Sequence, residues 1–199
     1  MSSLDRVADT HYPLLRHLTL PVVAVTSAHG GRINGMIANS AQRASLVPSH
    51  PRISVYISKI NYTHDLVMSS GVAAIHLLRR DHWDLIWHLG LQSGRDVDKL
   101  ATVPTHTQTT GAPLIDDALV AYDCRVANTM DAGGATFFLL DVVGAYNGPA
   151  GEVMTSVYFR ENMSPAKKDI YEERLVAAME YLEPLSSRVD PSLSWKAPK

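Results

Sequence analysis

Cysteine is nearly absent from this chain of 199 residues, which contains only Cys124. A single cysteine excludes an intramolecular disulfide and any metal site built from several thiolates. Its surroundings, "VAYDCRVAN", have the pattern of a strand, so we interpret Cys124 as a core residue. The nine histidines also lack a metal-binding pattern, because His82 and His88 do not have the i, i+4 spacing of a helical metal pair. No metal site is predicted.

Long apolar runs and basic runs are also missing. No stretch approaches the roughly 20 apolar residues of a membrane-spanning helix. The formal net charge is −2 and no segment is rich in lysine or arginine, which argues against nucleic acid as a partner. The first residues, "MSSLDRVADTHYPLLRHLTL", carry early acidic residues and no long apolar core, unlike a signal peptide. We therefore expect a cytoplasmic protein that binds neither membranes nor nucleic acid.

Several motifs of nucleotide-binding and hydrolytic enzymes are absent as well. The chain has no G-x-G-x-x-G after a strand, no P-loop, no G-x-S-x-G and no H-E-x-x-H. The glycines of "SAHGGRINGM" are not followed by the helix of a dinucleotide site. Ser-His-Asp combinations can be chosen freely from so many residues that they are uninformative. No catalytic residue is assigned.

What is present is a series of short strand patterns joined by turns. Strands are predicted at 20–28, 33–40, 52–58, 72–78, 118–130 and 135–147, with hairpin turns at "HGGR" and "DAGG". Shorter helices are predicted from Thr63 to a stop at Gly71 and over 79–91. Hairpins with few intervening helices favour a mostly β fold, a β-barrel with short helices, in one domain. His76, within the strand 72–78, is interpreted as a core histidine.

A last helix begins after an N-cap at Ser164, with Pro165 in its first turn, and is predicted to stop at Pro184. Its apolar residues form one stripe: Ile170, Leu175, Ala178, Met179 and Leu182. The tail "SLSWKAPK" is expected to be loosely ordered or to dock on a partner subunit.

The run "NGMIANSAQRAS" is unusual because small and polar residues stand where a strand could bury large side chains. Backbone amides and carbonyls can approach closely there, with hydroxyl and amide side chains between them. This chemistry suits a flat heteroaromatic ring with hydrogen-bonding edges, so the candidate ring-binding residues are Ala38, Asn39, Ser40, Ala41 and Ser45.

A second feature follows one strand later, in "SKINYTHD". A helix start there would present free amide donors and a partial positive charge, to which Lys59 adds a full charge. Lys59, Asn61 and Thr63 are therefore candidate phosphate ligands, although Thr63 could equally be a helix cap only. If the lysine contacts the phosphate, Lys59→Ala is expected to weaken binding of the ligand by about 1 to 3 kcal/mol.

These segments resemble the flavin reductase-like, FMN-binding split-barrel family. Members commonly show G-M followed by small and hydroxyl residues, then a V-S-L-x-P-P-like turn, a strand and T-H. The chain has "GMIANS", "ASLVP" and "YTH" in that order. Further on, "SGRDVDKLA" and "TGAPLIDDALVAYDCRV" are similar to two later family segments. The resemblance covers roughly residues 15 to 148.

The resemblance implies a flavin reductase-like, six-stranded split-barrel domain over 1–160, followed by a C-terminal helix and tail over 161–199. It implies a homodimer with flavin near the subunit interface, FMN as the cofactor, with FAD as the alternative, and NADH or NADPH as electron donor. Electrons would pass to free flavin, a partner monooxygenase or a small acceptor. The strand with Ala38 to Ala41 would follow the isoalloxazine edge, and the loop with Lys59, Asn61 and Thr63 would hold the phosphate.

The chain departs from the family pattern near the second hairpin and on the ring-binding strand. It has Gly134-Ala135-Thr136 where family reductases often carry D-H-T, so Ala135 replaces a histidine associated with nicotinamide handling. This favours an alternative, an FMN-binding electron-transfer protein (flavoredoxin-like) or a specialised flavoenzyme that does not use nicotinamide directly. A third hypothesis is a split-barrel interaction module without a cofactor. Arg43 would either lie near the flavin N1–C2=O edge, favouring reduced flavin, or be solvated.

Overall fold

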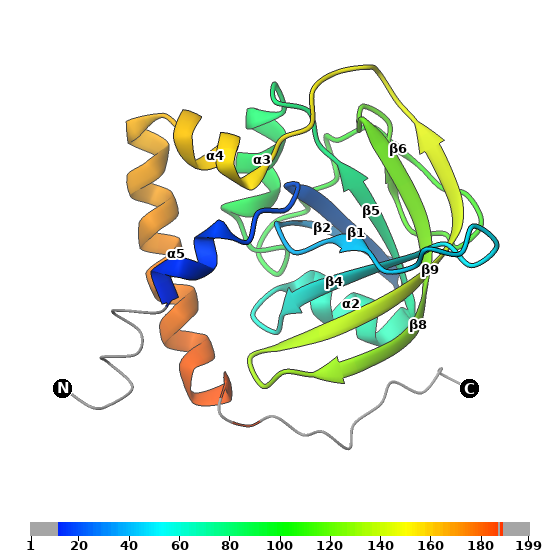
Figure 1. Ribbon diagram of the computed structural model, residues 1–199, viewed down its shortest axis with the longest axis horizontal. Helices are drawn as coiled ribbons and strands as arrows, with labels where there is room; N and C mark the ends of the chain where they lie inside the picture. The colour runs from blue at the N-terminus through cyan, green and yellow to red at the C-terminus, as the bar shows by residue number, and fades with distance from the viewer. Residues whose placement is uncertain (1–11, 187, 189–199) are drawn as a thin grey trace.

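The computed structural model describes residues 12–186 and 188. Its main element is a seven-stranded, wholly antiparallel sheet in the order β2-β1-β5-β8-β9-β4-β3. The strands are β1 (Val23–His29), β2 (Arg32–Ala38), β3 (Gln42–Arg43), β4 (Arg52–Ser58), β5 (Val72–Leu77), β8 (Val120–Asp131) and β9 (Ala135–Asn147). Figure 1 shows the sheet curving around its core. Its end strands, β2 and β3, do not pair with each other within the described chain, so the barrel is open there.

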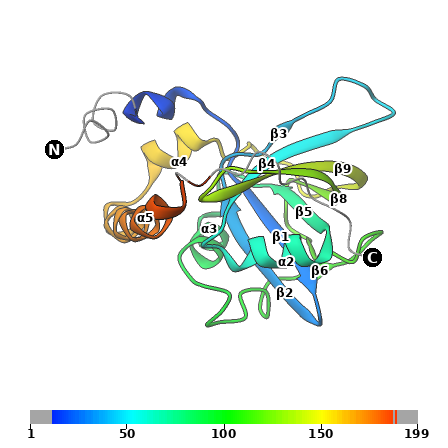
Figure 2. The ribbon, with the colours of Figure 1, turned by 90° about the horizontal axis from the view of Figure 1, so that it is seen from below.

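The remaining elements are short strands and helices at the flanks of this sheet. The strands β6 (Thr105–His106) and β7 (Leu114–Ile115) pair in a small second sheet. The helices are η1 (Tyr12–His17), α2 (Tyr62–Ser70), α3 (Trp83–Gly90), α4 (Ser156–Asn162) and α5 (Pro165–Ser186). Figures 1 and 2 show α5 beside α3 and α4, outside the curved sheet.

Alternating side chains explain how the sheet forms its core. Ile53, Val55 and Ile57 of β4 are buried, as the period of two along a strand predicts. They pack inside the sheet with side chains such as Val25 and Phe138. A second cluster lies under α3 and α4 and includes Ile86, Leu89, Met154 and Phe159. Each fully buried aliphatic or aromatic side chain stabilises the fold by about 1.5 to 3 kcal/mol.

The predicted mostly β class and both hairpins are confirmed. The turn between β1 and β2 contains Gly30 and Gly31 at positive φ, and α2 ends at Gly71 in the left-handed conformation. His76 is a buried core residue, as predicted. The predicted loose tail, 192–199, lies outside the described residues.

Two predicted helix boundaries were wrong. Asn61, with extended backbone, is the N-cap of α2, whereas Thr63 is fully buried and accepts a hydrogen bond from Asn34. Pro184 lies inside α5, which continues to Ser186. A proline removes only one backbone donor and is tolerated near a helix end, and the last turn is held by its packing against the turn at Gly133.

The predicted apolar stripe of α5 is only partly turned inward. Ala178 and Leu182 are half-buried, whereas Ile170, Leu175 and Met179 are exposed. The helix instead packs through a neighbouring stripe that includes Tyr171.

Candidate functional site

Two neighbouring pockets lie along α3, one at the end of β2 and one at the start of α2, and together we call them the α3 groove. One part, of about 150 Å³, is lined by Ala38 and Asn39 together with residues of α3. The other, of about 260 Å³, is lined by Asn61 and Thr63. Both parts are lined by Gly90 and Leu91, which makes them neighbours. The predicted ring segment and the predicted phosphate segment therefore meet along one surface.

The α2 end of the groove presents polar groups that the protein does not fully satisfy. Asn61 makes no side-chain cap hydrogen bond to the first turn of α2, where the His64 amide donates to the Asn61 carbonyl at 3.0 Å. The Asn34 amide is 1% exposed, and its Nδ2 donates to Thr63 Oγ1 at 2.8 Å. Its Oδ1 has no partner within the described residues. A buried polar atom without a partner is costly, so this end of the groove is suited to a polar ligand.

The loop after α3 closes tightly over Asn34. A Cβ at Gly94 would lie 2.1 Å from Asn34 Oδ1, so only glycine allows this approach. The next residue, Arg95, donates to the Ile60 carbonyl at 2.8 Å and to Asp65 Oδ2 at 2.7 Å. These two bonds hold the loop against the start of α2.

Lys99 fixes the same loop from beneath. Its ammonium, 3% exposed, donates to the carbonyls of Leu89 at 2.7 Å and Gln92 at 3.2 Å. A cation at these carbonyls also complements the C-terminal end of the α3 dipole. Burial lowers the pKa of Lys99 to about 8, so the side chain is mostly charged at neutral pH.

The charge balance at the α2 end favours an anion. The lining side chains include the cations of Arg95, Lys99 and Arg174 and no carboxylate, although Arg95 also pairs with Asp65 behind the lining. A helix N-terminus adds amide donors and a partial positive charge. This arrangement is suited to a phosphate group.

The β2 end of the groove is less polar. Ala38 and Asn39 face Trp87 of α3, with Phe159 of α4 and Tyr171 of α5 completing the lining. An aromatic slot beside a strand with a short side chain can accept a flat ring, while Asn39 offers both a donor and acceptors.

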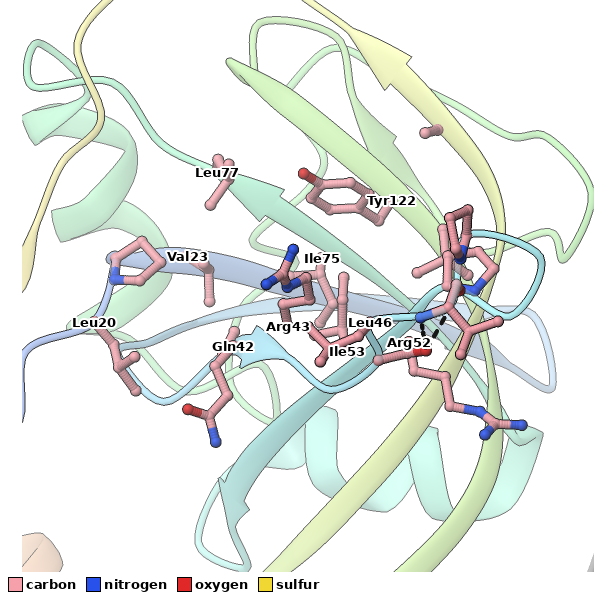
Figure 3. A pocket seen from close by; sticks show the side chains of 18 residues that line it. Leu20, Val23, Gln42, Arg43, Leu46, Arg52, Ile53, Ile75, Leu77 and Tyr122 are labelled. Atoms are coloured by element: carbon pink, nitrogen blue, oxygen red, sulfur yellow. Dashed lines mark hydrogen bonds between the residues drawn. The ribbon is translucent and has the colours of Figure 1, made fainter.

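A second, larger cavity of about 760 Å³ opens at the end of the curved sheet, and we call it the barrel mouth. Figure 3 shows its mainly apolar lining, with Leu77 and Tyr122 above Arg43 and Gln42 in this view. Ala41 and Ser45 line this cavity rather than the α3 groove. The structure thus separates the predicted ring-binding residues into two neighbouring sites.

Two predicted ligands line none of these cavities. The Lys59 ammonium donates to both carboxylate oxygens of Asp131, at 2.8 and 3.0 Å, and holds the pKa of Asp131 below its ordinary value. The Ser40 hydroxyl donates to the Tyr56 carbonyl at 2.8 Å. The Lys59 ammonium has a third N–H donor, but a phosphate contact would compete with its ion pair to Asp131.

Ala135, at the position that motivated the alternative function, is fully buried at the start of β9. The adjacent turn contains Gly133 at positive φ, and α5 packs against it through Leu182, Leu185 and Ser186. The surface at this turn is therefore covered by the chain's own last helix.

Sequence reasoning missed Asn34 and Arg174, and it did not assign Arg95 and Lys99 as site residues. In the sequence, Arg95 and Lys99 belong to "SGRDVDKLA", which is informative only through its similarity to a family segment. The need for glycine at Gly94 is visible only in three dimensions, because it depends on the position of Asn34.

The described residues contain no group of three or more potential metal ligands of the His, Cys, Asp and Glu types. Within the same part of the chain, no helix has the length and apolar character needed to cross a bilayer.

Comparison with known proteins identifies the class. A family model described as "Flavin reductase like domain" matches residues 15–167. The chain therefore belongs to the flavin reductase-like family.

Three relatives illustrate the range of this similarity. The chain is 32% identical over 149 residues to the high molecular weight rubredoxin of Moorella thermoacetica, with 74% of this chain and 64% of the relative covered. It thus spans less than two thirds of that protein. It is 29% identical over 137 residues to the FMN reductase (NADH) RutF of Ancylobacter novellus, covering 69% and 72% of the two chains. The solved NADH:FAD oxidoreductase SgcE6 of Streptomyces globisporus C-1027 superposes with a TM-score of 0.66 at 27% identity, covering 74% and 89%.

Proposed function

We propose that this protein is an FMN-binding oxidoreductase in which NADH or NADPH reduces the flavin. The electrons then pass to free flavin, a partner monooxygenase or a small acceptor. Family membership and relatives named FMN reductase (NADH) and NADH:FAD oxidoreductase support the reaction class. FMN is the proposed cofactor and FAD the alternative.

The observation that carries this proposal is that the two pockets of the α3 groove lie side by side at Gly90 and Leu91. The slot at Ala38 and Asn39 would hold the isoalloxazine ring, and the cationic end at Asn61, Thr63 and Arg95 would hold the phosphate. The shared lining at Gly90 and Leu91 would carry the ribityl chain. The residues present therefore fit each chemical part of FMN.

The protein's part in the reaction is positioning. The flavin supplies hydride acceptance from nicotinamide, and the protein supplies orientation and electrostatics. Trp87 and Asn39 would fix the ring plane and edge, while the start of α2 and Arg95 would hold the phosphate. Hydride transfer needs no protein acid or base, which agrees with the absence of an assigned catalytic residue.

The barrel mouth adjoins the strand that carries the predicted ring-binding residues, with Ala41 and Ser45 in its lining. We propose that the protein is a homodimer and that a second subunit meets the flavin near this open side. A flavin-dependent monooxygenase as partner and a cytoplasmic location are further parts of the proposal, as is the division into a domain over 1–160 and a helix and tail over 161–199.

An electron-transfer protein that does not use nicotinamide directly is the second candidate. It is favoured by Ala135 and by the packing of α5 over the neighbouring turn. Reduction of the bound flavin by dithionite but not by NADH or NADPH would select this candidate.

The test of the site is a fluorescence titration of FMN with the purified protein and two matched arginine variants. Arg95→Gln removes a cation from the α3 groove, whereas Arg43→Gln removes one from the barrel mouth. We expect Arg95→Gln to weaken FMN binding by about 1 to 3 kcal/mol, as loss of a charge-assisted contact does. Arg43→Gln should leave the affinity nearly unchanged. The opposite order would place the phosphate at the barrel mouth.

Lys59→Ala belongs in the same titration. The predicted loss of about 1 to 3 kcal/mol requires the ammonium to reach the phosphate in competition with its ion pair to Asp131. Unchanged affinity in Lys59→Ala, together with a loss in Arg95→Gln, would assign the phosphate to the α3 groove without Lys59.

A further inference from the structure

The C-terminal helix α5 lies along the α3 groove, although nearly all of it follows the residues matched by the family model. Tyr171 lines the aromatic slot, whereas Arg174 and Ala178 line the cationic end. Their spacing of three and seven residues places them on one face of a helix. One face of α5 therefore contributes to both parts of the groove.

The helix α5 is held in place on both sides of the residues that line the α3 groove. Near its start, the Tyr171 ring packs edge-on against Phe159 at 5.6 Å, and the Lys167 ammonium lies 5.7 Å from the Trp87 ring centre. Its last turn packs on the β8–β9 turn, where a Cβ at Gly133 would lie 2.5 Å from the Leu185 carbonyl oxygen. Anchors on either side fix the position of the middle turns, including Arg174.

Arg174 is suited to bind a ligand rather than to stabilise the fold. Its side chain is exposed, and it takes part in none of the ion pairs found between the described residues. The same end of the groove contains the buried Asn34 amide, of which Oδ1 lacks a partner.

We propose that α5 closes the α3 groove as a retaining wall for flavin, with Arg174 pairing with the phosphate from the side opposite α2. The inference rests on the proposed function and deepens it, because it adds a phosphate ligand from outside the matched domain. Arg174 is here a binding residue with no part in hydride transfer.

The test compares FMN with riboflavin, which has the same ring and ribityl chain but no phosphate. Dissociation constants would be measured by fluorescence quenching for the full chain, Arg174→Gln and Lys168→Gln. Lys168 is the matched control because it is an exposed cation on the same helix that pairs with Glu172 at 3.8 Å and does not line the groove. Thermal melts of the three proteins check that α5 remains folded.

We expect Arg174→Gln to bind FMN about five- to tenfold more weakly, as removal of one exposed charge-assisted contact does. Riboflavin binding should be unchanged, and Lys168→Gln should behave as the unmodified chain with both ligands. Equal FMN affinity in Arg174→Gln and the unmodified chain would overturn this inference alone. An unmodified chain that binds neither ligand would overturn the proposed function and the inference with it.

Discussion

His76 should make the protein less stable in mild acid, by an amount that follows from its buried environment. The imidazole on β5 is fully buried, with Nδ1 3.1 Å from the Ala24 carbonyl oxygen. The Ile115 backbone N–H donates to Nε2, also at 3.1 Å. A neutral ring with its proton on Nδ1 satisfies both contacts, whereas a second proton on Nε2 would face the Ile115 donor. Burial lowers the pKa of His76 from 6.5 to about 4.

The sign of the effect follows from the lowered pKa. Between pH 6.5 and about 4 the unfolded chain binds a proton at His76 that the folded chain does not. The free energy of unfolding therefore falls as the pH decreases through this window and levels off below it. A lowering of this size corresponds to about 3 kcal/mol of lost stability.

The measurement is urea unfolding at pH 7 and pH 4 for the unmodified protein and for His76→Gln. The glutamine amide can donate to Ala24 and accept from Ile115, but it does not titrate. Other groups titrate alike in both proteins, so the difference between the two pH dependences isolates His76. We expect the unmodified protein to lose about 3 kcal/mol more than the variant. Equal losses would refute the reasoning.

Three further predictions concern α5, the groove and the cysteine. In urea unfolding, Gly133→Ala should destabilise the protein by about 1 kcal/mol more than Gly31→Ala. Both glycines have φ near +75°, but only Gly133 lies against α5. Equal losses would show that the contact between Gly133 and α5 is unimportant for stability. Thr63→Val should cost about 1 to 3 kcal/mol of stability and weaken FMN binding, since the buried Asn34 Nδ2 loses its acceptor at Thr63 Oγ1; unchanged melting and affinity would contradict this. Cys124 should resist alkylation in the folded protein, because burial raises the pKa of its thiol; rapid labelling at pH 8 would contradict it.

The sequence predicted the strands well because each carries local information. The alternation in "RISVYIS" identifies the buried face of β4, and glycines mark the turns at 30–31 and 133–134. The ends of α2 and α5 were harder to predict. Whether Asn61 or Thr63 caps α2 depends on the distant Asn34, and the extension of α5 beyond Pro184 depends on its packing against the β8–β9 turn.

The candidate site was only partly accessible from the sequence. Small polar residues after β2 and the helix start at Asn61 indicated a ring region and a phosphate region. The two regions lie next to each other along α3, and Arg174 lines the phosphate region. Both facts depend on long-range packing, which no local sequence pattern reveals. Lys59 was predicted from its charge and position, and its pairing with Asp131 requires the neighbouring hairpin to be in place.

The most direct test of the central claim is an anaerobic absorbance spectrum of the FMN-loaded protein before and after adding NADH, and then NADPH. We predict that the visible absorbance band of the bound flavin bleaches with one of these donors, as hydride transfer to the flavin requires. A bound flavin that ignores both donors but bleaches with dithionite would contradict the reductase function and select the electron-transfer alternative. A protein that stays colourless when FMN is added would contradict flavin binding itself.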